Sequence, residues 1–190
     1  ESGKIKAIWI MATNPVVSLP DADQVKRALD KCEFVVVSDI CQDTDTTQYA
    51  DVLLPALGWG EKDGTVTNSE RRISRQRAFL DAPMQAKADW WAISQVAQKM
   101  GFTGFDFNNS HDIFLEHAQL SAEQNSDLSQ RSETPYFRYF NLQGLSNLTA
   151  QEYDELDPVQ WPVWDKHQDA KSVTRLFAQG QFSHADGKAK

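Results

Sequence analysis

Three polar residues, Asn14, Asp39 and Lys62, each follow a strand-like stretch of the sequence and could together bind a nucleotide. In an open α/β sheet, ligands bind beyond the carboxyl ends of the strands. A carboxylate can accept hydrogen bonds from the ring N–H and the adjacent amino group of guanine at once, and Asp39 fits this task. The glycine fingerprint GxGxxG is missing, which argues against an ordinary NAD-binding fold.

Each of these residues also has a purely structural interpretation. Asp39 could cap the turn after its strand, and Asn14 precedes a proline in a dipeptide that is common in turns. The stretch from Glu61 to Arg77 holds five basic and three acidic residues, a local charge of +2. Its arginines could hold a pyrophosphate or could simply lie in solvent. Spacing alone leaves these alternatives open.

A parallel α/β sheet is the architecture that would bring the three residues together. The predicted order is strand, helix, strand, loop and strand, over 5–11, 18–31, 34–37, 42–48 and 51–55. Ser18 or Asp21 is the expected cap of the helix. The continuous apolar run before Ser38 is typical of a parallel strand buried on both faces. The sequence therefore predicts a layered, Rossmann-like α/β fold with flanking helices and right-handed crossovers.

The pattern of residues in the rest of the chain predicts helices and little other regular structure. Helices are expected at 89–100, 110–120 and 149–156, the last opening on a capping box. Asp89 is the expected N-cap of the first of these helices, and Gly101 is expected to end it. An extended piece over 65–74 precedes them. The stretch 121–135 is expected to be a loop, and the chain from Pro158 onward is expected to be irregular.

Composition and charge exclude several classes of function. The chain has 190 residues, of which 41% are hydrophobic, enough for a globular core. Its net charge of -8 disfavours nucleic acid and anionic membranes as partners. No apolar run approaches the ~20 residues of a membrane span. Cys32 and Cys41 lack any metal-ligand spacing and are expected to be buried free thiols in a reducing compartment. The four histidines show no ligand spacing and are expected at the surface.

The ends of the sequence are typical of an internal segment of a longer protein. The chain begins at Glu1 without an initiator Met and enters a strand-like stretch almost at once. It stops at Lys190, shortly after a turn signal, and it shows no signal peptide. We therefore expect a longer parent chain.

Several strings of residues resemble one known family. The strings are Ile10–Pro15, Val37–Asp39, Ala50–Ala56, Trp59–Arg72 and Lys87–Trp90, of which Trp59–Arg72, with its Glu-Lys-Asp-Gly-Thr, is the most specific. They resemble the molybdopterin oxidoreductases of the dimethyl-sulfoxide-reductase superfamily, which include nitrate reductases and formate dehydrogenases. Later strings, 158–162 and 175–189, look most like the assimilatory nitrate reductase branch. The resemblance spans nearly the whole chain.

The resemblance implies a cofactor site in this segment. It makes 1–120 the later half of a split α/β domain that binds the guanosine end of one of two molybdopterin guanine dinucleotides, and 121–190 a loop-rich extension. Asn14 would contact the phosphates or the ribose, and Asp39 would read the guanine. The full set of cofactor-binding residues that it implies is Asn14, Ser38, Asp39, Lys62 and Asp89.

The resemblance also describes a parent enzyme of which this segment would be one part. It implies a molybdenum bis(molybdopterin guanine dinucleotide) cofactor, a 4Fe-4S cluster bound elsewhere in the parent, an electron-donating subunit or redox protein, and a cytoplasmic location. The segment matches no molybdenum ligand and no cluster cysteine, so we expect it to hold no catalytic residue and no metal, and to be inactive alone. The expected reaction is nitrate to nitrite. The alternatives are the same segment of a formate dehydrogenase alpha subunit, or a non-catalytic nucleotide-binding module.

Overall fold

The chain forms two compact units, seen in a computed structural model. The first unit comprises Glu1–Lys62 and Ala78–Asp106, and the second comprises Asp63–Arg77 and Phe107–Lys190. The residues that the structure describes are 1–123, 138–167, 175–178, 180, 182, 184 and 186–189. These units are not the two parts predicted from the sequence, 1–120 and 121–190, which refer to domains of the parent protein. That division stays a prediction.

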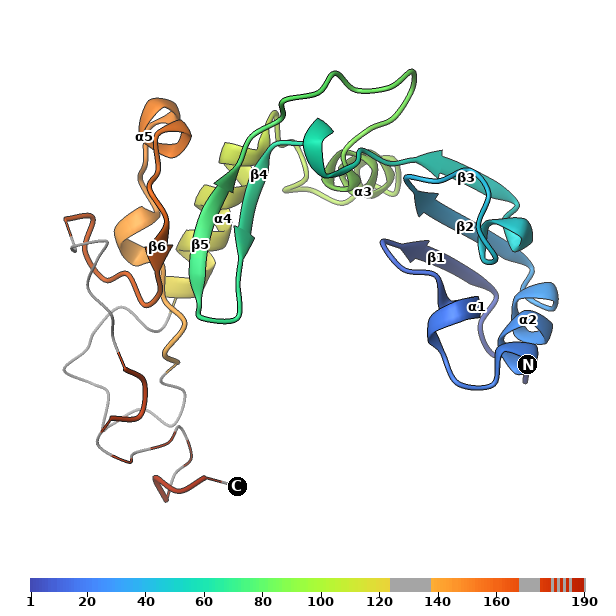
Figure 1. Ribbon diagram of the computed structural model, residues 1–190, viewed down its shortest axis with the longest axis horizontal. Coiled ribbons are helices and arrows are strands. Elements are labelled where there is room, and N and C mark those ends of the chain that lie inside the picture. Colours follow the sequence, from blue (N-terminus) through green and yellow to red (C-terminus); the bar gives the residue numbers. More distant parts are fainter. Residues whose placement is uncertain are drawn as a thin grey trace. The chain divides into compact units, whose positions relative to one another are not determined.

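A parallel sheet of three strands organises the first unit (Figure 1). Strand β1 (Ala7–Met11) pairs with β2 (Phe34–Asp39), and β2 pairs with β3 (Val52–Pro55), both in parallel. Two helices, α1 (Pro15–Ser18) and α2 (Ala22–Asp30), connect β1 to β2. A 3-10 helix, η1 (Thr47–Tyr49), precedes β3. The predicted order of strands and the predicted α/β class are confirmed.

Helix α2 covers one face of this sheet because its apolar residues lie on a single side. Val25 and Leu29 pack with Ile10, Val35 and Val37 in one hydrophobic cluster. The helix begins after Asp21, whose side chain accepts a hydrogen bond from the backbone N–H of Gln24 at 3.1 Å. Of the two caps proposed from the sequence, Asp21 is therefore the one used. The separate turn α1 was not predicted.

Helix α3 (Asp89–Lys99) completes the first unit, and its apolar stripe is largely uncovered. Ile93, Val96 and Met100 are 41%, 39% and 69% exposed, whereas Ala97 is buried. The N-cap is Ala88 and not Asp89, which is the first residue of the helix and makes no capping hydrogen bond. Gly101 follows the helix at φ 86°, as predicted for a residue that ends it.

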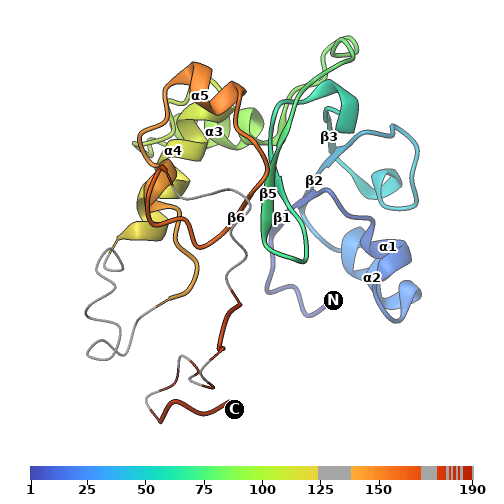
Figure 2. The same cartoon turned by 60° about the vertical axis from the view of Figure 1, so that its left-hand side comes forward.

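The second unit contains an antiparallel sheet that the sequence did not predict (Figure 1 and Figure 2). Strands β4 (Gly64–Thr67) and β5 (Arg72–Gln76) form a hairpin, and β6 (Val159–Gln160) pairs with β5. The side chain of Asn68 closes the turn by accepting hydrogen bonds from two backbone N–H groups, those of Glu70 and Arg72. The single extended piece expected over 65–74 is therefore two strands, and the chain after Pro158 is not wholly irregular.

Two helices supply the core of the second unit. They are α4 (Ser110–Ala122) and α5 (Ala150–Asp154), and a 3-10 helix, η4 (Gln143–Leu145), lies between them in the chain. Their apolar residues pack with those of β5 and β6, and the buried members of this cluster are Ile73, Phe114, Ala118, Leu142, Leu145, Leu148, Tyr153, Val159 and Val163. The predicted helices and the capping box of α5 are confirmed. Most of the predicted loop 121–135 lies outside the described residues.

Two predictions about single residue types need correction. Cys32 and Cys41 are free thiols, as expected, but Cys32 is only half-buried and Cys41 is exposed. His111 is not a surface residue: it is half-buried, and its Nε2 lies 2.8 Å from the backbone oxygen of Leu148. His117, His167 and His184 are exposed, as predicted. In the part of the chain that the structure describes, no helix is long and apolar enough to cross a membrane.

The capping box of α5 makes part of the stability of the second unit depend on pH. A hydrogen bond from Lys166, together with the backbone N–H of Thr149, lowers the pKa of Glu152 from 4.5 to about 2. The carboxylate therefore stabilises α5 above pH 4.5, and this contribution is lost as the pH falls through about 2. We expect Glu152→Gln to lower the hydrogen-exchange protection of α5 at pH 5 and to match the wild type well below pH 2, where the carboxylate is protonated. A difference that persisted well below pH 2 would contradict this assignment.

Candidate functional site

The carboxyl ends of the parallel strands bring two predicted site residues to one edge of the first sheet. Asp39 is the last residue of β2, and Asn14 follows the end of β1 by three positions. The register pairs Met11 with Ser38, so the two strands end side by side. Between Met11 and Asn14 the backbone turns through Ala12, which has φ 53°. A left-handed conformation at a residue other than glycine is strained, and such strain often occurs at functional sites.

Thr46 fixes the loop after β2 against the turn after β1. Its hydroxyl donates to Asn14 Oδ1 at 2.5 Å and accepts from the backbone N–H of Val16 at 3.2 Å. Thr46 is fully buried, and its neighbour Thr47 is bonded to Thr44 within the same loop. The Asn14 amide nitrogen has no hydrogen-bond partner among the residues that the structure describes. Sequence reasoning missed Thr46, although the threonine-rich composition of the loop was its one visible signal.

Asp39 is half-buried and presents one carboxylate oxygen without a protein partner. Its Oδ1 accepts from the backbone N–H of Cys41 at 2.9 Å, which is the turn-capping role considered from the sequence. Among the described residues, Oδ2 has no hydrogen-bond partner. The backbone oxygen of Asp39 accepts from Ala56 at 3.0 Å, which holds the end of β2 against the chain that follows β3. The capping role and a ligand-binding role are therefore compatible in this side chain.

Ser38 is buried beneath this edge and already has a protein partner. The indole N–H of Trp9 donates to Ser38 Oγ at 2.9 Å, and Ser38 is only 3% exposed. Its hydroxyl proton can still be donated. The contact of Ser38 with a cofactor stays a prediction. The structure also shows that Ser38 positions the side chain of Trp9.

Lys62 follows the 3-10 helix η2 (Trp59–Glu61), in the loop that leaves β3. Glu61 caps this turn by accepting from the backbone N–H of Gly58 at 2.7 Å. The backbone oxygen of Gly60 accepts from two consecutive N–H groups of the segment 79–80, both at 2.9 Å. The ammonium group of Lys62 has no hydrogen bond or ion pair with any described residue. The charge of Lys62 is thus available to an anion.

Asp89 reaches the same sheet through a short bridge beyond β3. Ala56 and Lys87 form an isolated parallel bridge, and the backbone N–H of Lys87 donates to the oxygen of Pro55 at 3.0 Å. Asp89 comes two residues after this bridge and is half-buried. Asp89 is thus the first residue of α3, shortly after the extra strand position that the bridge adds. A role in cofactor binding stays a prediction for Asp89 as well.

The arginines of β5 and its flanks make contacts with protein groups, and a role in holding a pyrophosphate stays a prediction for this region. Arg71 Nη1 donates to the oxygen of Trp161 at 2.7 Å, and Arg72 pairs with Glu70 at 2.9 Å. Arg77 donates to the backbone oxygen of Asp154. Of the five basic residues between 61 and 77, only Lys62 lacks such a partner among the residues that the structure describes.

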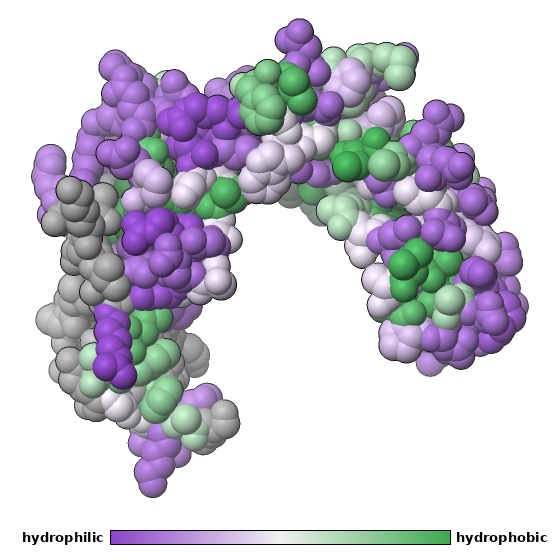
Figure 3. Space-filling view, in the orientation of Figure 1, coloured by the Kyte–Doolittle hydropathy of each residue, from purple (hydrophilic) through white to green (hydrophobic). Residues whose placement is uncertain are grey.

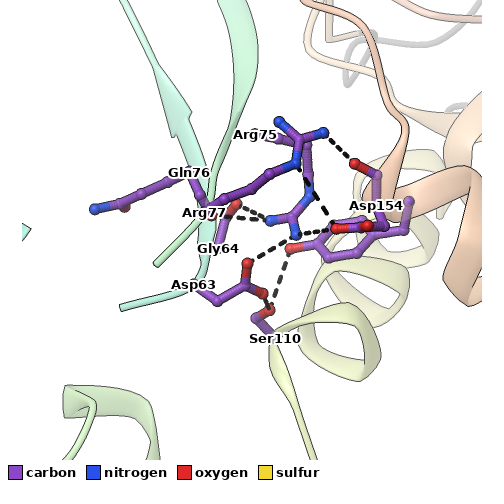
Figure 4. Close-up of polar contacts among 8 residues, drawn as sticks. Asp63, Gly64, Arg75, Gln76, Arg77, Ser110 and Asp154 are labelled. Atoms are coloured by element: carbon purple, nitrogen blue, oxygen red, sulfur yellow. Dashed lines mark hydrogen bonds and ion pairs between the residues drawn. The ribbon is translucent and has the colours of Figure 1, made fainter. Parts of the chain in front are cut away.

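Arg75 is the most buried of these arginines (Figure 4). Its side chain is 3% exposed and pairs with Asp63 at 2.8 Å and with Asp154 at 3.3 Å. Burial lowers the pKa of Arg75, but the hydrogen bond to Asp63 and the charges around it outweigh burial and raise it. The guanidinium also lies 4.0 Å from the centre of the Tyr153 ring. Arg75 is therefore a structural cation of the second unit.

The predicted site residues offer three kinds of polar group. Asp39 supplies an acceptor, Asn14 a neutral donor and Lys62 a positive charge. Within the described ranges, no group of three or more His, Cys, Asp or Glu side chains could hold a metal ion.

The parallel sheet with flanking helices defines a Rossmann-like α/β protein. Residues 1–99 match the family model described as Molybdopterin oxidoreductase. The chain therefore belongs to the molybdopterin oxidoreductase family, as the resemblance of its sequence strings implied.

Individual relatives agree with this assignment. A nitrate reductase of Shewanella frigidimarina is 54% identical and covers 99% of this chain, which spans 19% of that relative. A nitrate reductase of Klebsiella oxytoca is 47% identical, with 99% of this chain and 20% of the relative covered. The F420-dependent formate dehydrogenase subunit alpha of Methanocaldococcus jannaschii is 36% identical, with 100% of this chain and 25% of the relative covered. The chain thus spans about a fifth to a quarter of the length of these relatives.

A solved structure supports the fold. Acetylene hydratase from Pelobacter acetylenicus aligns with a TM-score of 0.63 at 16% identity, over 96% of this chain and 21% of that chain. At this identity the likeness supports the fold alone.

Proposed function

We propose that this chain is the segment of a molybdenum-dependent nitrate reductase that binds the guanosine end of one molybdopterin guanine dinucleotide. The observation that carries the proposal is that Asp39 Oδ2 and the Asn14 amide, which follow the ends of two adjacent parallel strands, have no described protein partner. Such strand ends are where open α/β sheets bind ligands. The Lys62 ammonium, in the loop that leaves β3, is also without a described partner. That the parent protein is an oxidoreductase follows from its family. The contact of this segment with guanosine is our proposal.

The three groups match the parts of a guanine nucleotide. The ring N–H and the amino group of guanine are adjacent donors, which one carboxylate can accept together, so Asp39 would read the base. The Lys62 ammonium would neutralise part of a pyrophosphate, and Asn14 would donate to a phosphate or ribose oxygen. The bound cofactor supplies the redox and oxygen-atom chemistry, while these residues hold its nucleotide end in place.

The relatives that match the whole chain support nitrate as the substrate of the parent enzyme. Two nitrate reductases reach 54% and 47% identity over 99% of it, above the 36% of the formate dehydrogenase subunit. We therefore favour reduction of nitrate to nitrite and keep formate oxidation as the alternative. A stand-alone nucleotide-binding module is disfavoured, because the matching relatives are several times longer than this chain. The 4Fe-4S cluster, the molybdenum ligand and the contact with an electron donor would lie elsewhere in the parent.

The remainder of the parent chain is the expected partner of this segment. Hydrophobic surface is visible along the loop between β5 and α3 (Figure 3). In that loop Phe79, Leu80 and Met84 are 75%, 56% and 100% exposed. Together with the exposed apolar residues of α3, these side chains could contact other parts of the parent chain. The two free thiols agree with the expected reducing cytoplasm.

A comparison of the affinities for guanosine diphosphate and adenosine diphosphate distinguishes base recognition from nonspecific binding of an anion. We expect the full-length apoprotein to bind the guanosine form at least about tenfold more tightly, because adenine presents an acceptor where guanine presents its ring N–H, and a carboxylate repels it. Isothermal titration of both nucleotides measures the ratio. Equal affinities would remove base recognition from the function of this segment.

A further inference from the structure

Asn14 stands at the N-cap position of α1, yet its side chain does not cap this helix. An asparagine at this position usually accepts a hydrogen bond from a backbone N–H of the first helical turn through its side-chain oxygen. Here the N–H of Val16 donates instead to the hydroxyl of Thr46, at 3.2 Å. Thr46, which lies 30 positions further along the chain, therefore takes the place of the usual cap and releases the side chain of Asn14.

The hydroxyl of Thr46 also determines which end of the Asn14 amide faces it. A hydroxyl has one proton to donate and two lone pairs that accept. It accepts from Val16 and donates its proton to Asn14 Oδ1, at 2.5 Å. A reversed amide would turn its NH2 group toward this hydroxyl, and the Thr46 proton would lose its acceptor. Because Thr46 is fully buried, an unpaired proton there would be destabilising.

Asn14 therefore offers a ligand hydrogen-bond donors. Its Oδ1 is held by Thr46, whereas its amide nitrogen has no partner among the residues that the structure describes. The side chain is half-buried, so a ligand at this edge of the sheet can reach it. The oxygens of a phosphate act as acceptors, and they match a side chain with only N–H groups to offer.

We propose that Thr46 is a positioning residue for the nucleotide site: its hydroxyl orients the Asn14 amide so that the N–H groups are offered to a phosphate oxygen of the cofactor. The inference rests on the proposed function, because it requires Asn14 to bind the nucleotide. Thr46 is fully buried and acts through Asn14.

Thr47 provides a matched control in the same loop. It is also buried, and its hydroxyl bonds with Thr44 and not with Asn14. Replacing either Thr46 or Thr47 with valine removes a buried hydroxyl and keeps the branched shape of the side chain. A general loss of order in the loop would appear in both variants, whereas a misoriented Asn14 amide would appear only in Thr46→Val.

Isothermal titration of guanosine diphosphate into the full-length apoprotein tests the inference. We expect Asn14→Ala to weaken binding about tenfold, as for loss of one hydrogen bond to a charged group. Asn14→Asp should weaken it further, because Thr46 would bond one carboxylate oxygen and the other would face the phosphate. Thr46→Val should weaken binding several-fold. Thr46→Ser, which keeps the hydroxyl, and Thr47→Val should bind as the wild type does.

A double variant tests whether Thr46 acts through Asn14. In the Asn14→Ala background, Thr46→Val should have no further effect on affinity, because the side chain through which it acts is gone. Additive losses would overturn the inference, and so would equal losses in Thr46→Val and Thr47→Val. If Asn14→Asp bound as tightly as the wild type, the amide would not be presenting its N–H groups to a phosphate.

The outcomes separate the inference from the function on which it rests. If Asn14→Ala weakens binding while Thr46→Val does not, Asn14 keeps its role and the positioning by Thr46 is overturned. If Asn14→Ala has no effect, the Asn14 contact and the inference both fail. If the wild type does not bind guanosine diphosphate, the proposed function fails with them. Thermal unfolding identifies any misfolded variant, and Asn14→Asp, which keeps the oxygen bonded to Thr46, then decides the result.

Discussion

Replacing Asp39 with Asn is expected to weaken binding of guanosine diphosphate to the full-length apoprotein by about 2 kcal/mol, or roughly 30-fold. The substitution keeps an oxygen that can accept from the backbone N–H of Cys41, so the turn after β2 is retained. It removes the charge and places an amide donor where the base also presents donors. Isothermal titration of the wild type and the variant measures the loss.

Inosine diphosphate makes this test specific to the base. Inosine lacks the exocyclic amino group, so the wild type should prefer guanosine diphosphate, and Asp39→Asn should lose most of that preference. Asp43→Asn is the matched control, because it removes an exposed carboxylate from the same loop and changes the net charge equally. If Asp43→Asn weakened binding as much as Asp39→Asn, the effect would be one of general charge, and Asp39 would lose its role as the base-reading residue.

Gly144→Ala should destabilise the second unit by about 3 kcal/mol, in the range of an overpacked core. A Cβ atom at Gly144 would lie 2.4 Å from the backbone carbon of Asp165 and 2.8 Å from the backbone nitrogen of Lys166. Backbone atoms cannot move aside as a flexible side chain can. The chain is held this close because the N–H of Gly144 donates to the oxygen of Val163 at 2.9 Å. Hydrogen exchange of peptides covering 141–167 in the full-length protein should show the loss of protection.

Gly64→Ala is the control for this prediction. No atom lies within 4 Å of a Cβ built at Gly64, so the added methyl group meets open space. We expect exchange in β4 and β5 to remain close to that of the wild type. Equal protection in the Gly144→Ala and wild-type proteins would mean that the approach of Asp165 to Gly144 is not maintained in solution.

Local patterns predicted the first unit well because its determinants are close together in the sequence. The apolar run in β2 and the cap at Asp21 are each readable within a few residues. Parallel pairing then follows from the alternation of strand and helix, and it brings Asn14 and Asp39 to one edge. Those parts of the candidate site that depend only on strand ends could therefore be predicted from the sequence.

The second unit could not be predicted in the same way, because its contacts join distant segments. Strand β6 has only two residues, and Ile73 pairs with Val159. The partner of Arg75 at Asp154 is 79 positions away, so an arginine that looks solvated in the sequence is buried in the fold. Thr46 was missed for a related reason, since its contact with Asn14 spans 32 positions.

The hydroxyl of Thr46 makes the carboxyl edge of the first sheet rigid before a ligand binds. Because that hydroxyl joins Asn14 and Val16 to the loop after β2, the turn after β1 and this loop are held together without any ligand. If a guanine nucleotide binds at this edge as proposed, it would meet a preorganised surface, and little conformational entropy would be lost on association. Residence time, more than the rate of capture, is then the quantity through which this edge would retain its cofactor.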